Sequence, residues 1–258
     1  MLLLQFALAT EMNITILRFD ALSSTNDEAA AQAKRGASEG LVILARSQTS
    51  GRGRHGRAWV SKPDAGLYFS IVLRPRLDAA SLPLITLMAG VAVCDTLLEF
   101  GAKADIKWVN DLLIDEKKVC GILAEAVETP TGLAVVLGIG VNLLREAVAD
   151  EHAGSAVSLE EVTGKNIPAN DLAECLTRYL NYLYTALCDE PDRIVHEWQL
   201  RSTYFSGKDV RVRTTTGDFT GTTDGLEQNG ALRVKLSDNS IVIVQAGDVE
   251  RLRTPDRF

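Results

Sequence analysis

A glycine- and arginine-rich segment at residues 51–57, with the sequence Gly-Arg-Gly-Arg-His-Gly-Arg, restricts the possible fold more than any other feature. Glycine permits positive φ angles and close approach of a ligand, whereas arginine supplies a permanent planar cation suited to carboxylate and phosphate oxygens. A packed core cannot accommodate this composition. The segment is therefore predicted to be a loop, and it is either a solvated basic turn or an anion-binding site.

The three glycines of this loop match the dinucleotide-binding pattern Gly-x-Gly-x-x-Gly, which is meaningful only between a strand and a helix. The apolar run at residues 41–45 predicts a strand before the loop. Residues 66–73 are β-branched and aromatic and precede Pro75, so they predict another strand rather than a helix. A Rossmann-type nicotinamide oxidoreductase is therefore excluded, and we expect a flexible anion-binding loop between two strands.

Composition limits the class of protein. A chain of 258 residues can hold one large domain, or a medium and a small one. The net charge of −7 argues against general nucleic-acid binding, because proteins that neutralise phosphate backbones are usually basic. Any function that needs positive charge must therefore be local, which again indicates the arginine loop.

Targeting and redox signals favour the cytoplasm. The four cysteines form no Cys-x-x-Cys pair and the three histidines are widely spaced, so neither a disulfide framework nor a metal cluster is predicted. Residues 1–9 are apolar but lack a basic start and a clear cleavage site, so we reject a signal peptide, and Met12 is an alternative start. No stretch reaches membrane-spanning length.

Hydrophobic periodicity predicts an α+β domain followed by a small β domain. Up to about residue 201, strands are expected at residues 14–19, 41–45, 66–73 and 133–144, a hairpin at residues 106–114 and 118–125, and helices beginning near residues 25, 81, 158, 171 and 191. From residue 210 onward the period becomes two, with frequent glycine turns, which indicates a small β-barrel. We predict domains at residues 1–203 and 204–258.

Polar residues gather where the first helix begins. Thr25 and Glu28 have the spacing of a capping box, but Ser24 and Asn26 add more polar groups than one cap requires. A helix N-terminus is also an anion site. Gln48, just before the arginine loop, could serve an amide- or urea-like ligand or could simply be a surface residue.

Aromatic and basic residues form a second group. Trp59 follows the arginine loop and could either stack on a base or pack in the core. Lys107 and Lys118 lie at the strand ends of the predicted hairpin, close in sequence to three further polar or aromatic residues, Trp108, Asn110 and Asp111. Asn142 is a polar residue in an apolar strand, so its amide must bind either the protein or a ligand.

Taken together, these motifs closely resemble the bacterial biotin protein ligases. The resemblance covers roughly residues 14–145 and rests on residues 24–26, 48, 51–57, 59, 107–111, 118–123 and 140–142. It implies an α+β catalytic domain, with a mixed sheet and flanking helices of the class II synthetase type. The strands after residue 204 match the small SH3-like β-barrel domain of that family.

The resemblance also implies a reaction. Biotin and Mg-ATP would form biotinyl-5′-adenylate, and a lysine of the apo biotin carboxyl carrier domain of a biotin-dependent carboxylase, such as acetyl-CoA carboxylase, would then take the biotin. Mg²⁺ would act with ATP as co-substrate, without a tightly bound metal, and the metal ligands are unknown. A cytoplasmic protein that binds neither DNA nor membranes, and that could form a homodimer, is expected.

Roles for individual residues follow from the same resemblance. Lys118 and Arg54 would be catalytic. Biotin would contact Ser24, Thr25, Asn26, Gln48, Arg52, Gly53, Arg54 and Lys118. The nucleotide would contact Arg52, Arg54, Arg57, Trp59, Asn110 and Asn142.

Two departures from the family pattern stand out. Val109 replaces a proline found in several members, which bears on the geometry of that turn. The first family motif begins near Ser24, which leaves no room for the N-terminal helix-turn-helix domain of bifunctional members, so a monofunctional ligase is expected. A lipoate–protein ligase or octanoyl transferase of the same fold stays open as an alternative. A nucleic-acid-binding module is a further alternative, disfavoured by the acidic charge.

Overall fold

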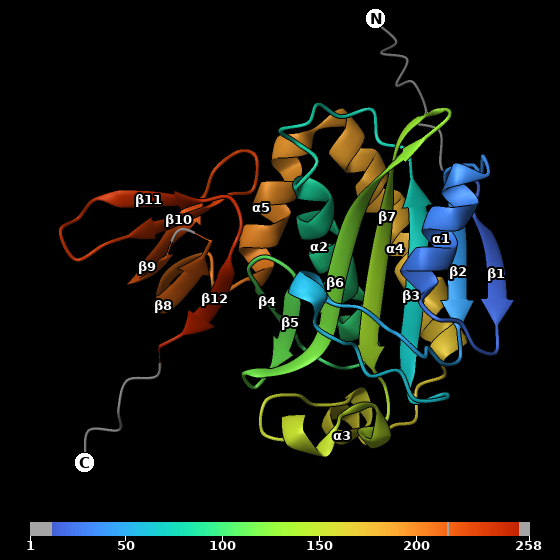
Figure 1. The fold of residues 1–258 in the computed structure, drawn as a ribbon. Helices are drawn as coiled ribbons and strands as arrows, with labels where there is room; N and C mark the ends of the chain where they lie inside the picture. The colour runs from blue at the N-terminus through green and yellow to red at the C-terminus, as the bar shows by residue number, and fades with distance from the viewer. Residues whose placement is uncertain (1–11, 216, 253–258) are drawn as a thin grey trace, which may run out of the picture.

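The computed structural model describes residues 12–215 and 217–252. Residues 1–9, for which a signal peptide is rejected, lie outside the described residues. A seven-stranded sheet in the order β1-β2-β3-β7-β6-β5-β4 forms the larger part of the molecule (Figure 1). Only the β1–β2 pair is parallel, so the sheet is mixed as predicted. Its strands are β1 (Thr15–Phe19), β2 (Leu41–Ala45), β3 (Gly66–Leu73), β4 (Asp105–Lys107), β5 (Asp111–Ile114), β6 (Lys117–Thr129) and β7 (Gly132–Asn142).

Helices cover both faces of this sheet (Figure 1). Helix α1 (Thr25–Lys34) lies on one face, where its buried alanines pack on β2, β3, β6 and β7. Helices α2 (Leu84–Glu99), α4 (Ala169–Asp189) and α5 (Pro191–Arg201) lie on the other, and short α3 (Leu159–Thr163) lies beyond the end of β7. The predicted mixed α+β fold is confirmed.

Strand periodicity divides the sheet into a core face and an open face. Alternate residues of β7, such as Leu137 and Ile139, enter the large apolar cluster with α2 and α4. Gly138 and Gly140, on the alternate positions, face the opposite side, toward α1 and the arginine loop. Because these positions carry no side chain, Asn26 and Trp59 can lie directly on the sheet.

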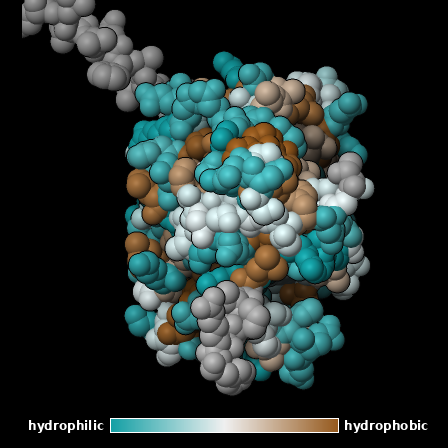
Figure 2. Space-filling view, turned by 90° about the vertical axis from the view of Figure 1, so that its left-hand side faces the viewer, coloured by the Kyte–Doolittle hydropathy of each residue, from teal (hydrophilic) through white to brown (hydrophobic). Residues whose placement is uncertain are grey.

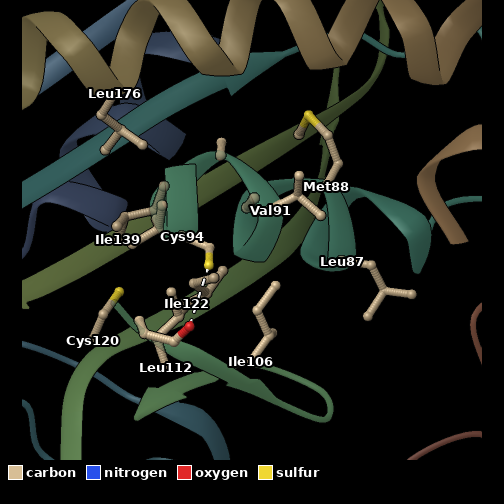
Figure 3. Packing of buried hydrophobic residues seen from close by; sticks show 14 of the residues in the cluster. Leu87, Met88, Val91, Cys94, Ile106, Leu112, Cys120, Ile122, Ile139 and Leu176 are labelled. Carbon is tan, nitrogen blue, oxygen red and sulfur yellow. Dashed lines mark hydrogen bonds between the residues drawn. The ribbon is translucent and has the colours of Figure 1, made fainter. Parts of the chain in front are cut away.

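The core face is filled by α2 (Figure 3). Met88, Val91 and Cys94 of α2 belong to one apolar cluster with sheet residues that include Ile106 and Ile122, and Cys94 points toward the sheet. Cys94 Sγ donates a hydrogen bond to the backbone oxygen of Ala104 at 3.5 Å. Burial is the main reason that the pKa of the Cys94 thiol is raised to about 12. The thiol therefore behaves as part of a dry core rather than as a nucleophile.

A second, five-stranded antiparallel sheet follows α5, in the order β11-β10-β9-β8-β12. It is the small β domain expected from the period-two pattern, and its SH3-like character agrees with the family resemblance. Its strands form an open sheet with β11 and β12 at the edges, rather than the closed barrel that was expected. Figure 2 shows its outer side, where polar and apolar side chains are interspersed. The strands are β8 (Ser206–Thr214), β9 (Gly217–Leu226), β10 (Leu232–Lys235), β11 (Ile241–Val244) and β12 (Asp248–Arg251).

Several local predictions need correction. The N-cap of α1 is Ser24, not Thr25, because the Ser24 side chain accepts a hydrogen bond from the backbone of Asp27. The single strand expected at residues 106–114 is two strands, β4 and β5, which pair with each other. Strand β12 was not predicted, because Val249 is its only apolar residue.

Three of the four cysteines are buried and free, whereas Cys188 is exposed at the end of α4. Within residues 12–215 and 217–252, no helix is long and apolar enough to cross a membrane. The proposed boundary after residue 203 stays a prediction.

Candidate active site

A cavity of about 1030 Å³ lies between the N-terminus of α1, the arginine loop, the β5–β6 hairpin and β12. It brings together all the residues for which the sequence predicted a site role, although they come from five separate segments. These residues are Ser24, Thr25, Asn26, Gln48, Arg52, Gly53, Arg54, Arg57, Trp59, Asn110, Lys118 and Asn142. Their individual roles stay predictions, and the contacts described below restrict what each side chain can do.

Gln48 is held rigidly at one end of this cavity. Its Oε1 accepts hydrogen bonds from the backbone nitrogen and the hydroxyl of Thr25, at 2.8 and 3.1 Å. Its Nε2 donates to Ser61 Oγ at 2.8 Å. With both ends of the amide engaged, its orientation is fixed before any ligand binds. Thr25, Gln48 and Ser61 therefore form one polar corner of the cavity, at the place where polar residues were predicted. The sequence did not indicate Ser61 as part of it.

Asn26 is buried beside this corner and bonds to two strands. Its Oδ1 accepts from Ser70 Oγ at 2.7 Å, and its Nδ2 donates to Glu125 Oε2 at 2.8 Å. A Cβ at position 138 would lie 2.1 Å from Asn26 Oδ1, so Gly138 is required for this close approach. The amide of Asn26 thus ties the start of α1 to the sheet, and this tie leaves it little capacity for a ligand.

The arginine loop is an ordered hairpin. Its two arms are joined by hydrogen bonds from Gly53 N to Arg57 O at 2.7 Å and from Trp59 N to Gly51 O at 2.8 Å. At its tip, His55 and Gly56 have φ angles of 55° and 72°, in the left-handed region. The predicted loop between two strands is therefore present, and these bonds give it the shape of a hairpin. Its flexibility stays a prediction.

Each arginine of the hairpin has a protein partner. Arg52 donates to Asp27 at 2.7 Å and to both carboxylate oxygens of Glu125 at 2.9 Å. Burial lowers the pKa of Arg52, but these two carboxylates more than compensate and raise it overall. Arg54 donates to Asn110 Oδ1 at 3.0 Å, and Arg57 pairs with Asp248.

Trp59 forms the floor of the cavity. Its indole lies so close to the sheet that a Cβ at Gly140 would be 2.5 Å from the ring, and one at Gly121 would be 2.9 Å from it. Its Nε1 is buried and has no hydrogen-bond partner among the described residues. A buried donor without a partner is costly, so this nitrogen is a candidate contact for an acceptor atom of a ligand.

Lys118 brings a positive charge to the same place. Its Nζ lies 5.5 Å from the centroid of the Trp59 ring and 2.6 Å from Asp111 Oδ1. Lys107 Nζ lies 3.9 Å from the other oxygen of Asp111. Asp111 therefore forms a close ion pair with Lys118 and lies near Lys107, so a positive charge is placed beside the Trp59 ring.

The two predicted nucleotide-binding asparagines also organise the backbone. Asn110 Nδ2 donates to Ile122 O at 2.9 Å, while its Oδ1 receives Arg54. Asn142 is buried, and its Nδ2 donates to Val157 O at 3.2 Å. Only the oxygen of the Asn142 amide is left for a ligand, so a nucleotide contact there would have to come from a donor group.

Sequence reasoning missed the acidic partners of the arginines. Asp27, Glu125 and Asp248 come from α1, β6 and β12, and no local spacing relates them to the hairpin. Asp111 was noted within the Lys-Trp-Val-Asn-Asp segment, but its pairing with Lys118 was not foreseen. Only folding places these carboxylates opposite the cations. Among the described residues, no group of three or more histidine, cysteine or acidic side chains is arranged to hold a metal.

Comparison with known proteins identifies the family. Residues 19–142 match the Biotin/lipoate A/B protein ligase family, and residues 205–252 match the Biotin protein ligase C terminal domain. The bifunctional ligase/repressor BirA of Bacillus subtilis is 33% identical over 96% of this chain and 77% of its own length. A biotin–[acetyl-CoA-carboxylase] ligase of Paracoccus denitrificans is 36% identical over 81% of this chain and 89% of its own.

A solved structure agrees. The biotin protein ligase of Aquifex aeolicus, in complex with biotin and ATP, superposes with a TM-score of 0.81 at 26% identity, over 93% of this chain and 99% of its own. These matches define the class, a biotin/lipoate-type protein ligase, and within that class the chain belongs to the biotin protein ligases. The family recognised from the motifs is confirmed, as is the class of enzyme.

Proposed function

We propose that this ligase uses the described cavity to join biotin to AMP and then to transfer biotin to a lysine of a biotin carboxyl carrier domain. In the first step a biotin carboxylate oxygen attacks the α-phosphorus of ATP, and pyrophosphate leaves. In the second, the lysine amine attacks the carbonyl of the mixed anhydride, and AMP leaves. The contact between Lys118 and Asp111 above Trp59 is the observation that carries the assignment.

Charge is the main requirement of the first step. Negative charge accumulates on the attacking carboxylate and on the phosphorus, and fixed cations in a poorly solvated site stabilise it most. Lys118 meets this requirement, because Asp111 holds its ammonium group 2.6 Å away inside the cavity. Mg²⁺ would enter with ATP as part of the nucleotide substrate, and the protein would supply the remaining positive charge.

The opposite end of the cavity would bind the biotin ring. Gln48 and the N-terminus of α1, with Ser24 as its cap, present oriented polar groups suited to a ureido group. The buried Nε1 of Trp59, which has no hydrogen-bond partner among the described residues, would donate to an acceptor atom of the bound intermediate. The nucleotide would then extend past Lys118 toward Asn142, which also lines the cavity.

The arginine hairpin would shield the intermediate from water. A mixed anhydride hydrolyses unless solvent is excluded, and a loop that closes over it is a recurrent solution. Arg54 is placed for this role, because it lies at the hairpin tip and is anchored to Asn110 of the adjoining turn. We infer that Arg54→Ala mainly loosens retention of the intermediate, whereas Lys118→Ala mainly blocks its formation.

The first experiment is a mass measurement on a carboxylase carrier domain incubated with the protein, Mg-ATP and biotin, with lipoate in a parallel reaction. A gain of one biotin, only in the biotin reaction, is expected. A gain only with lipoate would instead favour the lipoate–protein ligase alternative. No gain in either reaction, with a folded enzyme and a competent carrier domain, would overturn the proposal.

Oligomeric state and DNA binding are separate questions. A possible homodimer and the absence of DNA binding stay predictions. Bacillus subtilis BirA is a bifunctional ligase/repressor, and this chain spans 77% of it. Sedimentation with and without biotin and ATP tests the first prediction, and a salt-dependent DNA titration tests the second.

A further inference from the structure

The C-terminal sheet takes part in the cavity described above. Strand β12 pairs with β8 at the edge of that sheet, and Asp248, Glu250 and Arg251 of β12 line the same cavity as the arginine hairpin. A module too small to form a catalytic centre of its own therefore supplies part of the wall of the site. The contacts of β12 with the arginine hairpin define this contribution.

The tip of the arginine hairpin rests on the start of β12. Arg57 Nη2 donates to Asp248 Oδ2, and His55 Nε2 lies 3.8 Å from Asp248 Oδ1. Both Nη atoms of Arg54 lie 3.4 Å from the backbone oxygen of Gly247. Three basic side chains within four residues of the hairpin are thus directed at two adjacent residues, Gly247 and Asp248, at the other sheet.

The opposite end of the hairpin is held by the catalytic domain. Arg52 is fixed by Asp27 and Glu125, as described above. The hairpin is therefore anchored at two points, one in each sheet, and Arg54 lies between them. Because Arg52 and Arg57 are both held by carboxylates, they restrict the position of Arg54, which donates to Asn110 at 3.0 Å.

The environment of Asp248 suits this contact. Its side chain is about one quarter exposed. Partial burial alone would raise the pKa of its carboxyl group, but the hydrogen bond from Arg57 and the charges of Arg57, Arg54 and His55 outweigh burial and lower the pKa. Asp248 is consequently a stable anion at neutral pH, and its principal partner is the hairpin.

We propose that Asp248 is a positioning residue, which clamps Arg57 and thereby holds the arginine hairpin over the activated intermediate. The proposal rests on the proposed function, because it assigns the clamp to retention of the adenylate. Formation of the adenylate requires Lys118, which Asp248 does not contact. Loss of the clamp should therefore increase escape of the intermediate and leave its formation nearly unchanged.

The test is pyrophosphate release with biotin and Mg-ATP in the absence of a carrier domain. The wild-type enzyme should release one pyrophosphate per site in a burst and then release it only slowly, because the retained intermediate blocks turnover. Asp248→Asn should keep the burst, while the slow release that follows accelerates by roughly five- to tenfold, the factor expected when a charged acceptor of a hydrogen bond is replaced by a neutral one. Asp248→Glu, which keeps the charge, should restore much of the retention.

A double-mutant cycle separates the clamp from a general effect on structure. Arg57→Gln should match Asp248→Asn, and the double variant should be no leakier than either, because both remove the same contact. Asp224→Asn is the matched control, since Asp224 lies in the same module and pairs with Arg233 away from the cavity. If Asp248→Asn fails to fold, Arg57→Gln still tests the clamp, because the Arg57 side chain is 67% exposed.

The outcomes are distinct. A wild-type enzyme without a biotin-dependent burst would overturn the proposed function, and this inference with it. A normal burst, with the same slow release in wild type, Asp248→Asn and Arg57→Gln, would overturn the clamp alone. The clamp would also be contradicted if the double variant accelerated the slow release by the product of the two single-variant factors. Asp248 and Arg57 would then act independently of each other.

Discussion

Lys118 Nζ lies 2.6 Å from Asp111 Oδ1, which joins the two strands of the β5–β6 hairpin through a charged pair at the edge of the cavity. Since Asp111 also approaches Lys107, it balances two cations with one carboxylate. The site therefore keeps a net positive character toward an incoming carboxylate or phosphate. The catalytic prediction below follows from this arrangement.

Replacing Lys118 by Ala should lower the rate of adenylate formation by at least about a hundredfold, as is typical when one preorganised charge-stabilising group is removed. Asp111→Asn should have a smaller effect, near tenfold, because the ammonium group remains but loses its orientation. Single-turnover pyrophosphate release measures both. Lys117→Ala, which removes the exposed neighbouring lysine, is the control, and unchanged adenylation in Lys118→Ala would refute the assignment.

Glu125 couples the predicted biotin pocket to the arginine hairpin, since it accepts from both Asn26 and Arg52. Glu125→Gln should weaken biotin binding by roughly five- to tenfold, because hydrogen bonds to a charged acceptor are replaced by weaker neutral ones. Calorimetric titration with biotin provides the measurement. Glu128→Gln, an exposed acid on the same strand, should bind biotin like the wild type, and equal affinities of all three proteins would count against the coupling.

Gly138→Ala tests the close approach of α1 to the sheet. A Cβ there would lie 2.1 Å from Asn26 Oδ1, so Asn26 would have to move and break its bonds to Ser70 and Glu125. We expect the free energy of unfolding to fall by roughly 1–3 kcal/mol, as for other overpacked sites, and biotin affinity to fall with it. Urea unfolding gives the first value. Gly154→Ala, with no atom within 4 Å, is the matched control.

Low pH should weaken the contact between the two sheets. The pKa of Asp248 is lower in the folded protein than in the unfolded chain, so the unfolded state binds more protons in this range and stability rises with pH. The stabilisation is complete above about pH 4, the ordinary aspartate value, and is lost as the pH falls through the lower folded value. Between pH 6 and about pH 3, the melting temperature should therefore fall less steeply for Asp248→Asn than for the wild type. Parallel curves for the two proteins would contradict this linkage.

Local patterns in the sequence determined most of the elements and the family. Runs of apolar, β-branched and aromatic residues predicted β2, β3 and β7, a helix was expected to begin near residue 158, where α3 starts, and the glycine-arginine repeat indicated an anion site. These features depend on neighbours a few residues apart, so they can be read along the chain.

Only the tertiary structure decided which charges meet. The partners of Arg52, Arg54 and Arg57 lie 25 to 193 positions away in the sequence, and β12 carries too little apolar pattern to be predicted as a strand. Ion pairs between distant segments depend on how the sheets and α1 pack, because packing alone sets the distances over which charges interact. The sequence by itself therefore determined the chemistry that this protein can offer, whereas the packing of its two sheets determined where Arg57 and Asp248 hold the arginine hairpin.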